Sequence, residues 1–159
     1  MAKKLWGTRF PKKTSSLSDR FTSSISYDNR LAKYDILGSI AHARMLGKCH
    51  IIPFAEAGLI IKGLELILKD IKSGKFKVNP LAEDIHSHIQ ALLSQKIGRA
   101  ADKLHTARSR NDQIALDVKL YLKDEIRCLQ DLICLLQKSI LKFAKANSGV
   151  IIPGYTHLQ

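Results

Sequence analysis

The fold of this chain is decided by residues 109–149, which read SRNDQIALDVKLYLKDEIRCLQDLICLLQKSILKFAKANSG. Apolar residues recur here at a mean step of about 3.6, the period of an α-helix. A helix of this length spans roughly 50 Å and needs packing partners on each apolar side. We therefore expect one rod of a larger helix bundle; the alternative is collapse of the preceding helices onto it. The two apolar stripes are Ile114, Val118, Leu122, Ile126, Leu129, Ile133, Leu136, Ile140 and Phe143, and Leu116, Leu120, Leu132, Leu135 and Leu141.

The rest of the chain also predicts helices. Pro and Gly are few, and no stretch alternates β-branched with polar residues, so we expect an all-α fold. After an irregular arm at residues 1–16 and a short helix near 17–26, apolar spacing predicts three longer helices, and Pro53 suits the first turn of the second. We expect a helical N-terminal domain over residues 1–105 and the start of a helix-bundle domain over 106–159. The three longer helices are expected over about 29–48, 53–73 and 80–98.

Charge and hydropathy exclude several classes of protein. The net charge of +12 attracts polyanions, but the excess is scattered and aromatic residues make up only 6% of the chain. Most lysines are therefore expected on solvated faces, without specific nucleic-acid recognition. No apolar run approaches the ~20 residues of a membrane span, and no signal-peptide core follows the N-terminus. We expect a cytoplasmic protein that does not enter a membrane.

A dense polar cluster, LHTARSRNDQ at residues 104–113, stands just ahead of the long helix. Free N–H groups at a helix start carry a partial positive charge and bind carboxylates or phosphates. Arg108 and Arg110 add guanidinium groups that match a carboxylate, and Asn111 offers both a donor and an acceptor. Ser109 and Asp112 resemble a capping box. The cluster indicates either a site for a multiply acidic ligand or a well-capped helix with two solvated arginines.

Two further polar groups could belong to the same site. In GYTHLQ at residues 154–159, the hydroxyl of Thr156 can hold a carboxylate and the imidazole of His157 can transfer a proton, although a satisfied loop histidine is the alternative. In EDIHSH at residues 83–88, Asp84 suits a helix cap. His86 and the next histidine are two residues apart and do not share a helical face, so they predict no metal site.

These segments resemble the signature sequences of argininosuccinate lyase, a member of the fumarase/aspartase superfamily to which the δ-crystallins are related. The run HTARSRNDQ is specific, because fumarases, aspartases and adenylosuccinate lyases share the architecture but differ there. Similarity extends in order over almost the whole chain, as the N-terminal portion of such an enzyme. It implies a small helical domain followed by the first long helix of a central bundle. The remaining similar segments are residues 5–10, 21–31, 35–42 and 83–86.

The resemblance also implies a reaction. The family cleaves argininosuccinate to L-arginine and fumarate, in arginine biosynthesis, without metal or organic cofactor. In this β-elimination a base removes a proton from the carbon beside a carboxylate, and an acid helps the guanidino nitrogen leave. The carbanion is tolerable only when positive charge and hydrogen-bond donors already surround that carboxylate. By position, the resemblance assigns substrate binding to Ser24, Arg110, Asn111 and Thr156, an acid–base or orienting role to His157, and support to Asp84, His86, Arg108 and Ser109.

The assembly of the family bears on what this chain can do. Members are longer homotetramers in which each active site combines segments from three subunits, and a mobile serine loop further along carries the proposed base. We therefore expect an enzyme that is active as the full-length protein and inactive as this fragment. One alternative is a non-catalytic structural or polyanion-binding module of the same fold. Another is a sister lyase with a different succinyl substrate, which the RSRND run disfavours.

Overall fold

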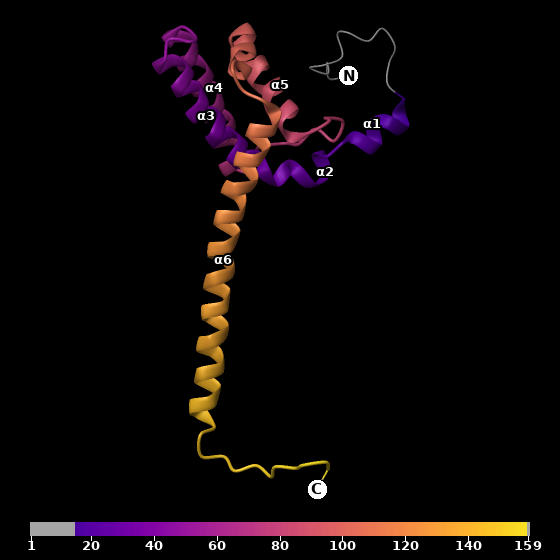
Figure 1. Ribbon diagram of the computed structural model, residues 1–159, viewed down its shortest axis with the longest axis vertical. Helices are drawn as coiled ribbons and strands as arrows, with labels where there is room; N and C mark the ends of the chain where they lie inside the picture. The colour runs from indigo at the N-terminus through magenta and orange to yellow at the C-terminus, as the bar shows by residue number, and fades with distance from the viewer. Residues whose placement is uncertain (1–14, 159) are drawn as a thin grey trace. The chain divides into compact units, whose positions relative to one another are not determined.

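The computed structural model describes residues 15–158, and within that range the chain contains helices and no strand (Figure 1). The predicted all-α class is confirmed. The predicted arm lies almost entirely outside the described residues, as does the similar segment at residues 5–10. In chain order the elements are α1 (Ser16–Thr22), α2 (Ile25–Asp28), the 3-10 helix η2 (Asn29–Leu31), α3 (Ala32–Lys48), α4 (Phe54–Lys72), α5 (Ile85–Ile97), the 3-10 helix η3 (Gly98–His105) and α6 (Arg110–Ala146).

The chain divides into two compact units, Met1–Tyr121 and Leu122–Gln159, and the division falls inside α6. In the first unit, α3 and α4 pack along each other and α5 packs against both. The buried apolar core lies among these helices, and Tyr121 packs against its edge. The domain boundary expected near residue 105 stays a prediction. Among the largest fully buried side chains are Ile36, Leu46, Ile60, Leu64, Ile67, Ile85, Ile89 and Leu93.

Most helix ends match the sequence pattern, but one start does not. The fourth helix was expected from about residue 80, whereas α5 begins at Ile85. Asp84 has extended backbone, and its side chain accepts a hydrogen bond from the Ser87 N–H at 2.6 Å. A carboxylate in this position caps a helix, so the preceding residues form turns instead. Two shorter features also differ: the helix expected near 17–26 is broken between α1 and α2, and η3 was not foreseen.

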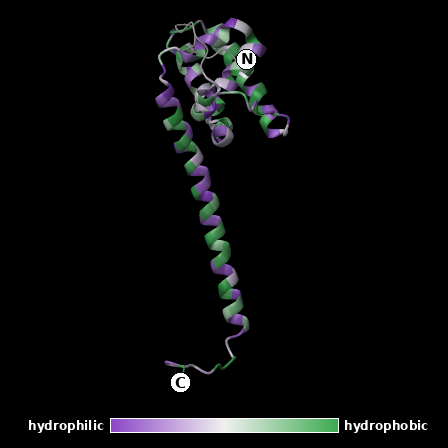
Figure 2. Cartoon of the chain, turned by 90° about the vertical axis from the view of Figure 1, so that its right-hand side faces the viewer, coloured by the Kyte–Doolittle hydropathy of each residue, from purple (hydrophilic) through white to green (hydrophobic). Residues whose placement is uncertain are grey.

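The second unit consists of the rest of α6 and an irregular segment at residues 147–158. Figure 2 shows hydrophobic and hydrophilic residues alternating along this helix. A single helix cannot bury its own apolar side chains, and those of both stripes are exposed, with exposed fractions from 48% at Leu122 to 72% at Phe143. Within residues 15–158 we find no helix with both the length and the apolarity needed to cross a bilayer.

Candidate functional site

The start of α6 is shaped by its own polar side chains. The Ser109 N–H donates to the Asp112 carboxylate at 3.2 Å, and the Asn111 N–H donates to the Ser109 hydroxyl at 3.1 Å. The predicted capping box is therefore present, with the serine hydroxyl bound one residue earlier than in the usual motif. Just before it, Ala107 has a positive φ of 55°, a conformation that L residues other than Asn and Asp adopt rarely. The chain thus makes a strained turn directly into the helix.

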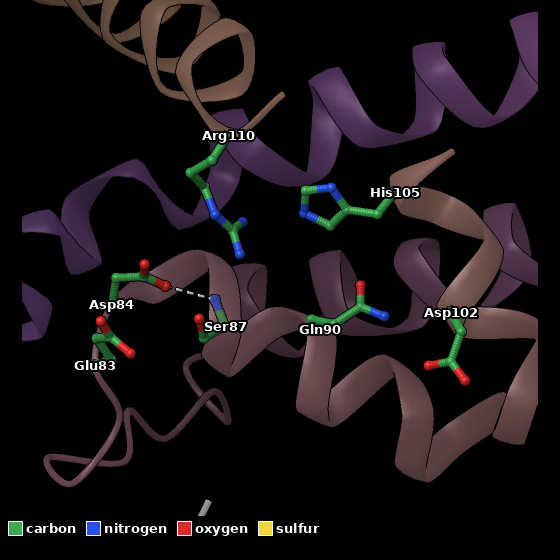
Figure 3. Close-up of a pocket in the computed structure, with 7 residues that line it drawn as sticks. All are labelled: Glu83, Asp84, Ser87, Gln90, Asp102, His105 and Arg110. Atoms are coloured by element: carbon green, nitrogen blue, oxygen red, sulfur yellow. Dashed lines mark hydrogen bonds between the residues drawn. The ribbon is translucent and has the colours of Figure 1, made fainter. Parts of the chain in front are cut away.

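Beside this turn lies a cavity of about 590 Å³, a volume typical of small-molecule sites. Arg110 reaches from the first turn of α6 toward the first turn of α5, where Asp84 and Ser87 lie (Figure 3). His105 stands next to Arg110, at the end of η3. The cavity is lined by Glu83, Asp84, Ser87, Gln90, Asp102, His105 and Arg110.

The lining carries charges of both signs. Glu83 and Asp84 lie at one side and Asp102 at the other, and the guanidinium of Arg110 points toward the side of Asp84 (Figure 3). Burial lowers the pKa of His105, and the nearby Arg110 and Arg108 lower it further, so its imidazole is neutral near pH 7. Its Nε2 is buried and has no hydrogen-bond partner among the described residues. Such a ring can donate to or accept from a bound ligand.

A buried polar cluster lies at the meeting point of α3, α5 and α6. The His86 Nδ1 lies 3.3 Å from the Asp35 carboxylate and 3.5 Å from that of Asp117, and all three side chains are buried. Burial alone would raise the pKa of Asp35, but His86, Gln113 and Arg108 together lower it, so this carboxyl is ionised. Burial opposes protonation of His86, but Asp35 raises its pKa. Burial and the charge of Asp35 raise the pKa of Asp117 to about 7.

The donor set of this cluster, two carboxylates and an imidazole, is one that binds divalent cations. The three residues can offer ligand atoms within 4.8 Å of one another. Asp35 raises the pKa of His86, however, which favours its positively charged form, and the half-buried guanidinium of Arg108 is a second positive charge nearby. A bound cation would have to displace protons from the cluster, and the positive charge of the Arg108 guanidinium would repel it. The expectation that the protein needs no metal stays a prediction.

The predicted site residues fall into distinct places. Arg110 and Asp84 line the cavity, and Asp84 also caps α5. The Ser24 N–H donates to the Glu83 carbonyl at 2.8 Å, which places Ser24 beside the acidic end of that cavity. Its hydroxyl donates to Asp28 at 2.6 Å. The structure thus brings three of the predicted residues, from three different segments, to one region.

The other predicted residues lie outside this cavity. Arg108 donates to the Ser39 hydroxyl at 3.1 Å, and His86 belongs to the buried cluster. Ser109 is exposed and serves the helix cap, and Asn111 is exposed at the first turn of α6. The remaining pair, Thr156 and His157, is exposed in the irregular segment of the second unit. His157 has a positive φ of 51°.

Sequence reasoning missed three residues that the structure places at or beneath the cavity. His105 belongs to the polar run at residues 104–113 but received no predicted role, yet it lines the cavity. Gln113 and Asp35 were not considered as site residues, although they connect Arg110 to the buried cluster. One signal could have pointed to this cluster. Asp35 and Asp117 are charged residues that lie at buried helical positions, and a charged residue is almost never fully buried unless it has a partner.

Comparison with known proteins gives a consistent result. A family model described as "Lyase" matches residues 8–159. The chain is 55% identical over 156 residues to an argininosuccinate lyase of Pelotomaculum thermopropionicum, and 53% identical over 159 and 156 residues to those of Syntrophotalea carbinolica and Geobacter sulfurreducens. These matches cover 98–100% of the chain but 34% of each relative. The chain therefore spans about a third of the length of these relatives, and the resemblance read from its sequence is confirmed.

Proposed function

Because the chain belongs to the lyase family whose model matches residues 8–159, we propose that it contributes to the cleavage of argininosuccinate into L-arginine and fumarate. In this reaction the bond between carbon and the guanidino nitrogen breaks. A base takes the proton from the neighbouring carbon, the electron pair forms the double bond of fumarate, and the departing nitrogen receives a proton. The argininosuccinate lyases that the chain resembles support this assignment.

The observation that carries the proposal is the position of Arg110. Its guanidinium enters a cavity at the N-terminal end of α6, where the helix contributes partial positive charge. Both charges favour a carboxylate, and more strongly the doubly charged carboxylate that forms when the neighbouring carbon loses its proton. Glu83, Asp84 and Asp102 supply negative charge in the same lining. Because argininosuccinate carries both carboxylates and cationic groups, a lining of both signs suits it.

The roles proposed for individual residues follow the resemblance. Arg110, Ser24 and the exposed Asn111 bind the substrate, together with Thr156. His157 acts in proton transfer or orients the group that does. The remaining residues support the site: Asp84 caps α5, Ser109 caps α6, Arg108 ties the turn to α3, and His86 belongs to the buried cluster.

We also propose that the working enzyme is a homotetramer whose sites combine segments of different subunits. The exposed apolar stripes of α6 support this, because an unpartnered amphipathic helix of this length associates with other helices in water. The domains proposed are a helical N-terminal domain over residues 1–105 and the start of a bundle domain from 106. The proposed site needs no metal or organic cofactor, and we place the enzyme in the cytoplasm.

Subunit complementation tests the proposal. The chain is coexpressed with the Pelotomaculum thermopropionicum relative altered at the position that aligns with His157, and fumarate release from argininosuccinate is followed. We expect the mixed assembly to regain activity, because the chain brings an intact His157 and Arg110 to sites whose other segments come from the relative. The chain carrying His157→Asn is the control and should restore nothing. Restoration by this altered chain, or mixed assemblies without activity, would refute the proposed role of His157.

A further inference from the structure

One face of α3 carries three polar residues that contact the turn and the start of α6. Asp35, Ser39 and His42 are spaced four and three residues apart, so they lie along one side of the helix. The His42 Nε2–H donates to the Thr106 carbonyl at 2.9 Å, and Arg108 donates to the Ser39 hydroxyl. Asp35 accepts a hydrogen bond from the side-chain amide of Gln113. The segment 106–113 is thus held at three points by a single helix.

Two of these contacts stand on either side of the strained residue Ala107. His42 holds the residue before it and Ser39 holds the residue after it. A positive φ at a residue with a side chain persists only where surrounding contacts impose it. Burial, together with the charge of Arg108, lowers the pKa of His42, so its ring is neutral near pH 7, and the contact with the Thr106 carbonyl requires the tautomer that carries its proton on Nε2. The face of α3 therefore imposes the shape of the turn.

The third contact reaches Arg110 through Gln113. An ionised Asp35 can only accept hydrogen bonds, so it turns the amide of Gln113 with its nitrogen inward and its oxygen outward. That oxygen accepts a hydrogen bond from the Arg110 Nη1 at 2.9 Å. Asp35 is itself held by His86, 3.3 Å away. A chain of contacts therefore runs from the buried cluster to the guanidinium in the cavity.

We propose that Asp35, Ser39 and His42 form a positioning face on α3, and that Gln113 transmits the position of Asp35 to the guanidinium of Arg110. None of these residues needs to touch the substrate, since they act by reducing the number of orientations that Arg110 adopts. The consequence for substrate binding rests on the proposed function. The ordering of the Arg110 side chain does not, because it depends only on contacts within the first unit.

The first measurement is the order of the Arg110 side chain in the 159-residue chain, from the ¹⁵N relaxation of its Nε–H group. In the unaltered chain we expect this group to be as rigid as the backbone of residues 110–121. The main variant is Gln113→Met, which keeps the volume and helix preference of glutamine but removes both hydrogen bonds. We expect it to free the Arg110 side chain, whereas the control Gln137→Met, at an exposed position of the same helix, should not.

A conservative variant separates positioning from simple structural support. Asp35→Asn keeps an oxygen that can accept from the Gln113 amide, so it should leave Arg110 largely ordered, whereas Asp35→Ala should free it. If Asp35 had only a structural role, both variants would change the unfolding midpoint, but they would not differ from each other in the order of the Arg110 side chain. The result that overturns the proposal is an Arg110 that is as rigid in folded Gln113→Met as in the unaltered chain. If Gln113→Met does not fold, an Arg110 that is mobile in the unaltered chain overturns it equally.

The second measurement is the affinity for succinate, used as a probe of the dicarboxylate end of the substrate. We expect Gln113→Met to weaken it about tenfold, as for the loss of one hydrogen bond to a charged group. Failure of succinate to bind the unaltered chain, with Arg110 still ordered through Gln113, would count against the proposed function and leave the positioning role standing. Weaker succinate binding with an unchanged Arg110 would overturn the positioning role.

Discussion

At the scale of single residues, Asp117 is the group whose charge the fold tolerates least. It is 1% exposed, and neither of its oxygens has a hydrogen-bond partner among the described residues. Deprotonation would put a second negative charge beside the ionised Asp35. The protonated form avoids this, since a neutral carboxyl carries no charge to desolvate.

This leads to a prediction about pH. The pKa of Asp117 rises from 3.8 in the unfolded chain to about 7 in the folded one. Between those values the folded state keeps a proton that the unfolded state has lost, so its free energy of unfolding falls as pH rises. Asp117→Asn removes this loss and should stabilise the chain above pH 7 by up to about 4 kcal/mol, at about 1.36 kcal/mol per pKa unit.

The measurement is urea unfolding of both chains at several pH values from 4 to 8. The raised pKa of His86 contributes stability that is present below pH 6.5 and is lost as pH rises through that pKa, so part of the slope should remain in the variant. Parallel curves for the two chains would show that Asp117 is ionised at neutral pH in the folded protein.

At the scale of elements, the packing of α3 on α4 depends on a glycine. A Cβ built on Gly47 would lie 2.7 Å from the Cβ of Ala57, closer than two such atoms can approach. Neither group is the flexible end of a long side chain, so relief requires the helices to separate. The close approach explains why a residue that disfavours helices stands inside α3.

Gly47→Ala should therefore lower the free energy of unfolding by about 1–2 kcal/mol, because overpacking outweighs the gain in helix propensity. Gly58→Ala is the matched control: it lies in α4, and nothing stands within 4 Å of the added Cβ. It should be neutral or stabilising by up to about 1 kcal/mol. Chemical denaturation measures the free energy of unfolding of both variants. Equal effects of the two substitutions would show that helix propensity, not packing against α4, determines the effect of Gly47→Ala.

At the scale of the whole molecule, the described part of the second unit, residues 122–158, contributes no residue to the buried core. Its helix exposes apolar side chains on both stripes, and a helix without packing is only marginally stable in water. Hydrophobic burial must come from other helices if residues 122–146 are to stay helical. We therefore expect the helix content of residues 122–146 to depend on association with further copies of the chain.

We predict that dilution lowers both the mass and the helix content of the protein. Ile133→Lys should weaken association by at least about tenfold, equivalent to about 1.4 kcal/mol, because it places a charge on an apolar stripe. Gln137→Lys adds the same charge at a polar position of α6 and should change little. Sedimentation velocity and far-UV circular dichroism follow the two quantities. A monomer that keeps all of α6 helical would contradict the coupling.

The helical class, the long helix and both ends of that helix follow from the amino-acid sequence alone. These depend on interactions within a few residues. One is the 3.6-residue period of residues 114–143, and the other is the pair of hydrogen bonds at the start of α6, from the Ser109 N–H to the Asp112 carboxylate and from the Asn111 N–H to the Ser109 hydroxyl. The start of α5 was misplaced because apolar spacing alone does not show which of several polar residues, here Asp84, becomes the cap. Of the residues that line the cavity, Arg110 and Asp84 were identified from the sequence.

Which side chains act together depends, in contrast, on how the helices pack. Asp35, His86 and Asp117 come from three helices, and the contact of Gln113 with Asp35 joins residues 78 positions apart. No local pattern encodes such a meeting, because it depends on how helices pack once their apolar faces are buried. The same packing sets the protonation of the cluster, since burial and close charges shift a pKa only after distant residues have come together.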